Sequence, residues 1–205
     1  MSSITIVGCG PGSKEYATLA ALNVIRDSDM LIGAKRLIDE FVTDKHAVVF
    51  TTIEDTLKTI GNCKKKVAVL VTGDPVFFSL TSCIIREFGK ISVSIIPGLS
   101  SITYAFGRMG IPWHDAAFMS AHKELPKNLN EFVKRCPKIG LLTSPKYSVE
   151  VLAGEIDPVS AVNRRFFVGQ NLSYRDESLK EYKFEELKGL KTDPLSVLII
   201  TTMEQ

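Results

Sequence analysis

The stretch Lys66-Val67-Ala68-Val69-Leu70-Val71-Thr72-Gly73-Asp74-Pro75 decides the fold class. Its apolar run over 67–71 contains no alternating polar residues, which is typical of a strand buried on both faces of a parallel sheet. Gly73, Asp74 and Pro75 then end the run, and an amphipathic stretch follows over 76–88. A buried strand that leads directly into a helix is half of a βαβ unit, so the stretch predicts an α/β fold.

The segments around this stretch repeat the alternation of strand and helix. The expected strands of the first half span 4–8, 30–33, 48–50, 66–72 and 91–96. The expected helices span 17–26, 34–41, 53–61, 76–88 and 101–109. Each of these helices has apolar positions at intervals of three and four residues, so the first half predicts a doubly wound sheet.

The pattern breaks at Gly110-Ile111-Pro112-Trp113-His114-Asp115, where we expect a domain boundary. We predict an N-terminal α/β domain over 1–113 and a C-terminal α/β domain over 114–205. The expected strands of the second domain span 117–120, 139–143, 165–168, 179–184 and 195–202, and its helices span 129–135 and 148–156. Ligand sites favour domain interfaces and the carboxyl ends of parallel strands, so a ligand cleft is expected between the two domains.

Composition excludes several classes of function. Hydrophobic residues make up 45% of the 205 residues and charged residues 23%, as in ordinary globular proteins. The net charge of +2 is too small for a nucleic-acid footprint. No apolar run approaches the ~20 residues that span a bilayer, and the N-terminus lacks the features of a secretory signal. We therefore expect a cytoplasmic protein that binds neither nucleic acid nor membrane.

The cysteines and histidines indicate no metal site. None of the four cysteines is spaced as C-x-x-C, so we expect reduced structural thiols. The three histidines are also widely separated in the sequence. These residues are Cys9, Cys63, Cys83, Cys136, His46, His114 and His122.

Gly8-Cys9-Gly10-Pro11-Gly12 follows the first predicted strand and resembles part of the dinucleotide fingerprint G-x-G-x-x-G. Ser13 occupies the third glycine position, and Pro11 removes an N–H from the loop that would hold a pyrophosphate. No glycine-lysine pair follows, which excludes a Walker loop. Two explanations remain: a plain strand-to-helix turn, or a loop whose glycines let a ligand approach the backbone.

Thr72-Gly73-Asp74-Pro75-Val76-Phe77-Phe78 forms a second loop at a strand end. Helix capping explains Asp74 as N-cap and Pro75 as the first helical residue. It does not explain Gly73 or the two aromatic residues. The functional alternative is that a carboxylate, loop amides and an aromatic wall bind an uncharged adenosine and an amino-acid group.

Pro97-Gly98-Leu99-Ser100-Ser101-Ile102 forms a third loop, again between a strand and a helix. Either serine is a suitable N-cap, which is the structural explanation. The functional alternative is that two hydroxyls and helix-terminal amides bind a ligand. Because the carboxyl ends of parallel strands share one edge of a sheet, we expect the three loops to converge.

The second half carries fewer candidates. His122, after a predicted strand, is either a structural histidine or a group that acts in the site. The loop over 169–177 is longer and more polar than a turn requires. Basic residues near predicted strand ends either bind ligand carboxylates or lie on the solvated surface. They are Lys35, Arg36, Arg108, Lys123 and Arg164.

Taken together, the loops resemble the tetrapyrrole methylase family across nearly the whole chain. The ordered segments are Gly8-x-Gly-Pro-Gly12, Gly33-x-Lys-Arg36, Gly73-Asp-Pro75, Pro97-Gly-Leu-Ser-Ser101 and Asn171-Leu-Ser-Tyr-x-Asp-Glu177. The second and fifth segments are similar to the cobalamin-pathway branch that methylates carbon 5 of a late precorrin (the precorrin-6Y or cobalt-precorrin-7 type). The chain departs from relatives at Lys123 and Ser79, where glycine is frequent.

The resemblance implies two α/β domains with S-adenosylmethionine in the cleft between them, and a homodimer. By their match to the family's motifs, the expected cofactor contacts are Pro11, Gly73, Asp74, Phe77, Ser100, Ser101, Leu142 and Leu172. At 205 residues the chain has no room for a carbon-15 methyltransferase domain, so a separate partner enzyme is expected.

The implied reaction needs no nucleophilic triad, because the sulfonium is already an activated electrophile. Basic side chains would bind the acid arms of the tetrapyrrole, and His122 is the candidate for proton transfer or positioning. Two alternatives stay open. One is another member of the superfamily, acting on an earlier precorrin, ribosomal RNA or diphthine. The other is a non-catalytic nucleotide-binding module.

Overall fold

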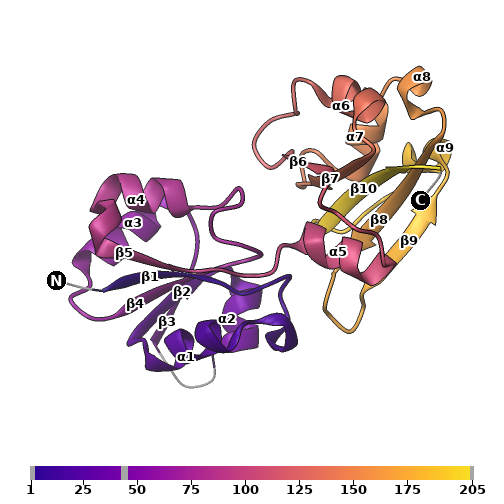
Figure 1. Cartoon of the computed structure of the whole chain (residues 1–205). Coiled ribbons are helices and arrows are strands. Elements are labelled where there is room, and N and C mark those ends of the chain that lie inside the picture. The colour runs from indigo at the N-terminus through magenta and orange to yellow at the C-terminus, as the bar shows by residue number, and fades with distance from the viewer. Residues whose placement is uncertain (1–2, 43–45, 204–205) are drawn as a thin grey trace. The chain divides into compact units, whose positions relative to one another are not determined.

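The computed structural model describes residues 3–42 and 46–203 (Figure 1). The chain divides into two compact units, Met1–Ser100 and Ser101–Gln205. The sequence predicted a boundary between residues 113 and 114, whereas the division comes before the helix that starts at Ser101. That helix packs on the sheet of the second unit, which accounts for the difference.

The first unit is a parallel sheet with helices on both faces. Its strands are β1 (Ile4–Gly8), β2 (Met30–Gly33), β3 (His46–Val49), β4 (Val67–Val71) and β5 (Val93–Ile96). Its helices are η1 (Lys14–Tyr16), α1 (Leu19–Asp27), α2 (Lys35–Phe41), α3 (Ile53–Asn62), α4 (Thr81–Phe88) and η2 (Lys90–Ser92).

The strands of the first sheet are ordered β3-β2-β4-β1-β5, and every neighbouring pair is parallel. Ile6 and Val69 pack with α3 and α4 on one face, while Val7 and Leu70 pack with α1 and α2 on the other. Figure 1 shows these two pairs of helices on opposite sides of the sheet. Burial of each such side chain stabilises the fold by about 1.5–3 kcal/mol. The doubly wound sheet and the burial of β4 on both faces are therefore confirmed.

The strand register brings three loops together at one edge of this sheet. Gly8 at the end of β1 pairs with Val71 at the end of β4. Val7 pairs with Ile96 at the end of β5. The loops that follow β1, β4 and β5 therefore start side by side.

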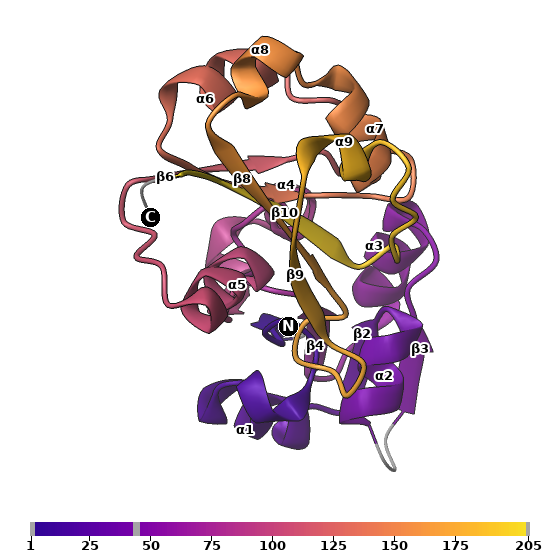
Figure 2. The same ribbon diagram turned by 90° about the vertical axis from the view of Figure 1, so that its right-hand side faces the viewer.

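The second unit is a mixed sheet with its own helices. Its strands are β6 (Ala116–Ser120), β7 (Lys138–Leu142), β8 (Arg164–Gln170), β9 (Ser178–Tyr182) and β10 (Ser196–Thr202). Its helices are α5 (Ser101–Met109), α6 (Leu129–Arg135), α7 (Val149–Glu155), α8 (Pro158–Ala161) and α9 (Phe184–Leu187). The strand order is β6-β7-β10-β8-β9, in which β6 and β7 are parallel and the other pairs are antiparallel. Figure 2 shows β8, β9 and β10 of this sheet.

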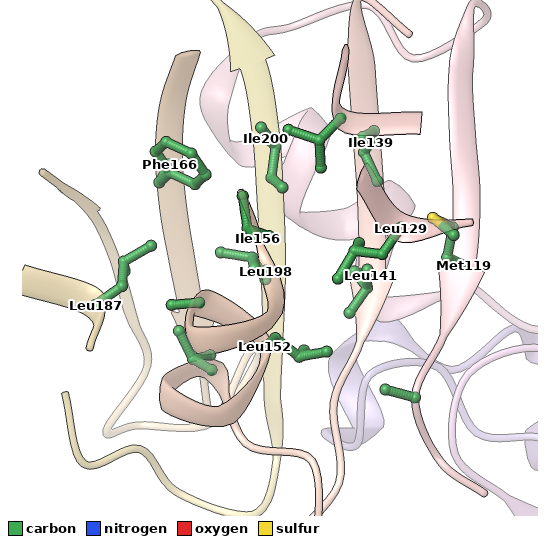
Figure 3. Close-up of a cluster of buried hydrophobic side chains, with 14 of the residues drawn as sticks. Met119, Leu129, Ile139, Leu141, Leu152, Ile156, Phe166, Leu187, Leu198 and Ile200 are labelled. Carbon is green, nitrogen blue, oxygen red and sulfur yellow. The ribbon is translucent and has the colours of Figure 1, made fainter. Parts of the chain in front are cut away.

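One face of the second sheet carries the main core of this unit. Leu129 of α6 and Leu152 of α7 join Leu141 of β7 and Leu198 of β10 in one buried cluster (Figure 3). Leu187 of α9 belongs to the same cluster. The two α/β units that the sequence predicted are thus both present, each with its own core.

Helix α5 packs against the second sheet through a close contact. A Cβ added at Gly140 of β7 would lie 2.2 Å from Cγ2 of Ile102, so only glycine leaves room for this side chain. Phe106 of α5 stacks with Phe118 of β6 at a ring-centroid distance of 6.4 Å. These contacts make α5 part of the second unit.

Several predicted boundaries were wrong. Helix α4 starts at Thr81 rather than at residue 76, because the chain over 75–80 forms a turn in which Phe78 has a φ of 53°. Strand β5 starts at Val93, after the 3-10 turn η2. Strand β9 ends at Tyr182, and Phe184 opens α9, where the Glu186 carboxylate accepts the Lys183 N–H at 2.8 Å.

Within the described residues, no helix is both long enough and apolar enough to span a membrane.

Candidate functional site

The first and second loops of the first unit are joined by backbone hydrogen bonds. The Cys9 N–H donates to the Val71 carbonyl at 2.9 Å, and the Gly73 N–H donates to the Gly10 carbonyl at 2.7 Å. Gly10 and Gly73 have φ values of 68° and 73°, in the left-handed region that glycine adopts without strain. This bridge fixes the two loops side by side beyond the ends of β1 and β4.

The third loop packs against the other two through glycine backbones. A Cβ added at Gly98 would lie 2.4 Å from the Gly73 carbonyl oxygen, and one added at Gly8 would lie 2.6 Å from the Gly98 nitrogen. Backbone atoms on both sides leave no side chain that could move away. Glycine at these positions is therefore required for the three loops to meet.

Asp74 ties the second loop to the third. Its Oδ1 accepts the Val76 N–H at 2.8 Å, and its Oδ2 accepts the Gly98 N–H at 3.2 Å. The capping explanation for Asp74 was wrong, because α4 starts later and Leu80 occupies its N-cap position. Asp74 instead stabilises a turn and a contact between loops.

The turn after Asp74 presents aromatic side chains. Phe77 is half-buried and Phe78 is 55% exposed, with their ring centroids 4.8 Å apart at an interplanar angle of 69°. The Pro75 carbonyl accepts hydrogen bonds from the hydroxyls of Ser79 and Thr81, which fixes the turn. A non-glycine residue with positive φ costs free energy, and such residues often occur at functional sites.

Five of the predicted cofactor contacts come together in the first unit. Pro11 lies in the first loop, Gly73, Asp74 and Phe77 lie in the second loop, and Ser100 ends the third loop. The Ser100 Cα is 3.8 Å from the position of a Cβ added at Gly73. The convergence of the loops that the sequence predicted is therefore present within this unit.

Ser101, Leu142, Leu172 and His122 belong to the second unit. Ser101 is the first residue of α5. Leu142 ends β7, and its carbonyl already accepts the Ala121 N–H at 2.8 Å. Leu172 is buried against Gly169 at the end of β8. That these residues contribute to cofactor binding stays a prediction.

His122 follows Ala121 at the edge where β6 and β7 end. Its side chain is exposed, and its N–H on the main chain donates to the Ser120 hydroxyl at 3.3 Å. Partial desolvation of the imidazole lowers the pKa of His122 below its ordinary value of 6.5. The lowered pKa favours the neutral imidazole, which is the form that can accept a proton.

Glu177, in the polar loop after β8, is the centre of a cluster that the sequence did not predict. It accepts the Tyr104 hydroxyl at 2.6 Å, the Ser173 N–H at 2.6 Å and the Arg108 Nε at 3.2 Å. Burial favours a higher pKa, but the hydrogen bonds and the positive charge of Arg108 outweigh it and hold the pKa of Glu177 below its ordinary value of 4.5. The loop is thereby fixed to α5.

Several predicted carboxylate-binding residues have partners in the protein. Arg36 donates to the Thr72 hydroxyl, and Lys35 pairs with Asp39 at 2.8 Å. Arg164 donates to the Cys136 carbonyl at 2.6 Å, which makes it a structural residue.

Burial raises the pKa of the Cys9 thiol to about 12, so Cys9 is a protonated core residue beside the first loop. The cysteines in this structure are free thiols. Within the described ranges, no group of three His, Cys, Asp or Glu residues is arranged to hold a metal ion.

Three backbone positions of these loops offer no N–H to a phosphate group. Pro11 has no N–H, the Gly73 N–H is bonded to Gly10, and the Gly98 N–H is bonded to Asp74. Asp74 supplies a carboxylate and Arg36 a guanidinium near the same strand ends. These groups fit a ligand that has an uncharged nucleoside together with ammonium and carboxylate groups, as S-adenosylmethionine has.

The first unit is thus a parallel α/β sheet whose glycine-rich loops meet at the strand ends. The family model described as Tetrapyrrole (Corrin/Porphyrin) Methylases matches residues 3–188, and the chain belongs to this family.

A curated relative matches over nearly its whole length. It is the probable cobalt-precorrin-7 C(5)-methyltransferase of Methanocaldococcus jannaschii, which is 29% identical over 98% of this chain and 97% of its own.

Two solved structures share the tetrapyrrole methylase fold. The precorrin-6Y methylase of Archaeoglobus fulgidus has a TM-score of 0.75 at 20% identity, covering 98% of this chain and 99% of its own. The uroporphyrin-III C-methyltransferase of Thermus thermophilus, solved with S-adenosylhomocysteine, has a TM-score of 0.76 at 19% identity, covering 100% of this chain and 94% of its own. At these identities the likeness establishes the fold.

Proposed function

We propose that this protein transfers the methyl group of S-adenosylmethionine to carbon 5 of cobalt-precorrin-7 in cobalamin biosynthesis. The observation that carries the proposal is the contact of three glycine-rich loops at the strand ends of the first unit. The substrate assignment rests on the curated relative that aligns over almost the whole chain. Any cobalt belongs to the substrate.

Tetrapyrrole methylases use S-adenosylmethionine, and we propose that the three loops hold it. Asp74 and Arg36 would bind the ammonium and carboxylate groups. Pro11, Gly73, Phe77 and Ser100 would line the nucleoside. The chemistry that the bound cofactor supplies is a methyl group activated by the sulfonium. The protein's contribution is then to hold both reactants in line and to exclude water.

We propose His122 as the group that accepts or orients a proton on the tetrapyrrole, because it follows the end of β6 and its side chain is exposed. Single-turnover methylation by His122→Ala tests this role. A slower methyl-transfer step with unchanged cofactor affinity supports it. An unchanged rate removes His122 from the chemistry.

We also propose that the protein works in the cytoplasm as a homodimer, beside a separate enzyme that methylates carbon 15. The family resemblance and the composition of the chain support these assignments. Analytical ultracentrifugation of the purified protein tests the dimer. A sedimenting mass equal to that of one chain, at the concentration used in the activity assay, would contradict it.

Calorimetry with S-adenosylhomocysteine tests cofactor binding. We expect binding of S-adenosylhomocysteine and none of NAD or ATP. Asp74→Ala should weaken this binding by about tenfold or more, because it removes a charged hydrogen-bond acceptor worth about 1.5–3 kcal/mol. Asp39→Ala, which removes an exposed carboxylate of α2 in the same unit, is the matched control and should bind like the wild type. A preference for NAD or ATP would contradict the proposal.

Methylation of purified late precorrins, with and without cobalt, tests the substrate. We expect transfer to carbon 5 of cobalt-precorrin-7. Transfer to an earlier precorrin instead would assign the chain to another branch of the family.

A further inference from the structure

Helix α5 carries two different stripes of side chains. Ile102 and Phe106 pack on the second sheet. Ser101, Tyr104 and Arg108 lie at positions i, i+3 and i+7, so they follow one another along a single stripe of the helix. The helical rise between Ser101 and Arg108 is about 10 Å. This stripe therefore leads from the end of the third loop to Arg108.

The Glu177 carboxylate holds the far end of this stripe. Its Oε2 is fixed by the Tyr104 hydroxyl and by the Ser173 N–H, both at 2.6 Å. Its Oε1 accepts the Arg108 Nε at 3.2 Å. The Glu177 side chain is 16% exposed, whereas the Arg108 side chain is 57% exposed. A largely buried carboxylate thus orients an exposed guanidinium.

Arg165 of β8 differs from Arg108 because it forms a bidentate ion pair. Glu181 accepts both its Nε at 2.9 Å and its Nη2 at 2.8 Å, which is the bidentate arrangement. Glu177 engages Arg108 through Nε. A guanidinium has five N–H donors, and its planar fork matches a carboxylate. Arg108 therefore combines a fixed orientation with exposure to solvent, as a carboxylate-binding residue requires.

We propose that Arg108 binds an acid side chain of the tetrapyrrole substrate, and that Glu177 positions its guanidinium. This inference rests on the proposed function, since a tetrapyrrole with acetate and propionate arms presents carboxylates at the edge of its ring. Ser101 at the start of the stripe is a predicted cofactor contact.

Steady-state kinetics with cobalt-precorrin-7 tests Arg108. We expect Arg108→Gln to raise KM by about tenfold, the loss expected for a hydrogen bond between charged groups. The kcat and the affinity for S-adenosylhomocysteine should stay unchanged. Arg108→Lys should recover part of the KM, because it keeps the charge but loses the fork. Arg165→Gln, the matched control from an arginine already paired in the same unit, should change KM by less than about twofold.

Glu177→Gln tests the positioning role, because glutamine keeps the size of the side chain but loses its charge. We expect a rise in KM smaller than that of Arg108→Gln, with kcat unchanged. The KM of the wild type should rise with salt as the ion pair with substrate is screened. That salt dependence should be weaker in Arg108→Gln, a change that a purely structural role would not produce.

The outcomes separate this inference from the proposed function. If the wild type binds S-adenosylhomocysteine and methylates cobalt-precorrin-7, but both Arg108→Gln and Arg108→Lys keep its KM and salt dependence, the role of Arg108 is refuted. If Arg108 variants change KM while Glu177→Gln does not, the positioning role of Glu177 is refuted. If the wild type neither binds S-adenosylhomocysteine nor methylates the substrate, the proposed function itself is wrong.

Discussion

The glycine-rich loops of the first unit and the polar loop of the second unit are held in opposite ways. In the first unit, the backbone atoms of three glycines are in direct contact, and a side chain at Gly8 or Gly98 would not fit. The third glycine is Gly73. The loop after β8 is fixed by the Glu177 carboxylate, which gathers a hydroxyl, an amide and a guanidinium. The first arrangement depends on the absence of side chains and the second on one particular side chain. Substitutions should therefore affect them differently.

The largest effect is expected at Gly98. In Gly98→Ala the new Cβ would lie 2.4 Å from the Gly73 carbonyl oxygen, so the loops must move apart. We expect a loss of about 3 kcal/mol in the free energy of unfolding, at the upper end for overpacking. S-adenosylhomocysteine binding should be lost with it. Urea unfolding followed by circular dichroism measures the first effect, and calorimetry measures the second.

Gly107→Ala in α5 is the matched control. Nothing lies within 4 Å of a Cβ added there, and the residue is helical. We expect stabilisation by about 0.5–1 kcal/mol, because alanine is the better helix former. Equal unfolding free energies for the two alanine variants would disprove the close contact of the three loops.

Glu177 should give an intermediate effect that depends on pH. In Glu177→Ala the Tyr104 hydroxyl and the Ser173 N–H lose a charged acceptor, so we expect a loss of about 1.5–3 kcal/mol at pH 7. Because folding lowers the pKa of Glu177, its stabilising contribution is present above pH 4.5 and is lost as the pH falls through the folded value. Urea unfolding of the wild type and of Glu177→Gln across this range measures it.

The control for this pH dependence is Glu181→Gln. Glu181 also has a lowered pKa, through its hydrogen bond from Arg165, but its side chain is 47% exposed. Exposed ion pairs contribute about 0–1 kcal/mol. Glu181→Gln should therefore barely change how the unfolding free energy falls at low pH. If the unfolding free energy of the wild type and that of Glu177→Gln depend on pH in the same way below pH 4.5, the stabilising role of the Glu177 cluster is contradicted.

Phe78 should give the smallest effect, and one of opposite sign. Its φ of 53° is unfavourable for a residue with a Cβ, and its ring is largely exposed. Phe78→Gly should stabilise the protein by up to about 1 kcal/mol, because relief of the left-handed strain exceeds the added chain entropy. Thermal unfolding measures this change. A clear drop in stability would mean that the ring has a structural role.

The sequence predicted most of the first unit because its signals are local. The continuous apolar run over 67–71 predicted a strand buried on both faces, as β4 is. In the structure, the register of β4 with β1 places the two loops that follow them side by side. The predicted start of α4 was wrong because the pair Asp74-Pro75 is typical of a helix N-terminus, although here it forms a turn. The choice between cap and turn depends on the hydrogen bond from Gly98, which lies far along the chain.

The second unit was harder to predict because its decisive contacts are distant in sequence. Helix α8 was missed, although Asp157 and Pro158 are a recognisable start: the Asp157 carboxylate accepts the Val159 N–H at 3.0 Å. Glu177 lies in a segment that resembles the tetrapyrrole methylase family, but the sequence does not indicate what it binds. The spacing of Tyr104 and Arg108 on one helix stripe was visible in the sequence, whereas their common partner was not.

The contact between Ile102 and Gly140 also has a consequence for how the sequence can diverge. Because the methyl group of Ile102 occupies the space of a Cβ at position 140, neither residue can change freely by itself. In related chains, a side chain larger than hydrogen at 140 should be accompanied by alanine or another small residue at 102. The two positions should therefore covary, and Ile102→Ala should offset part of the destabilisation that Gly140→Ala causes alone.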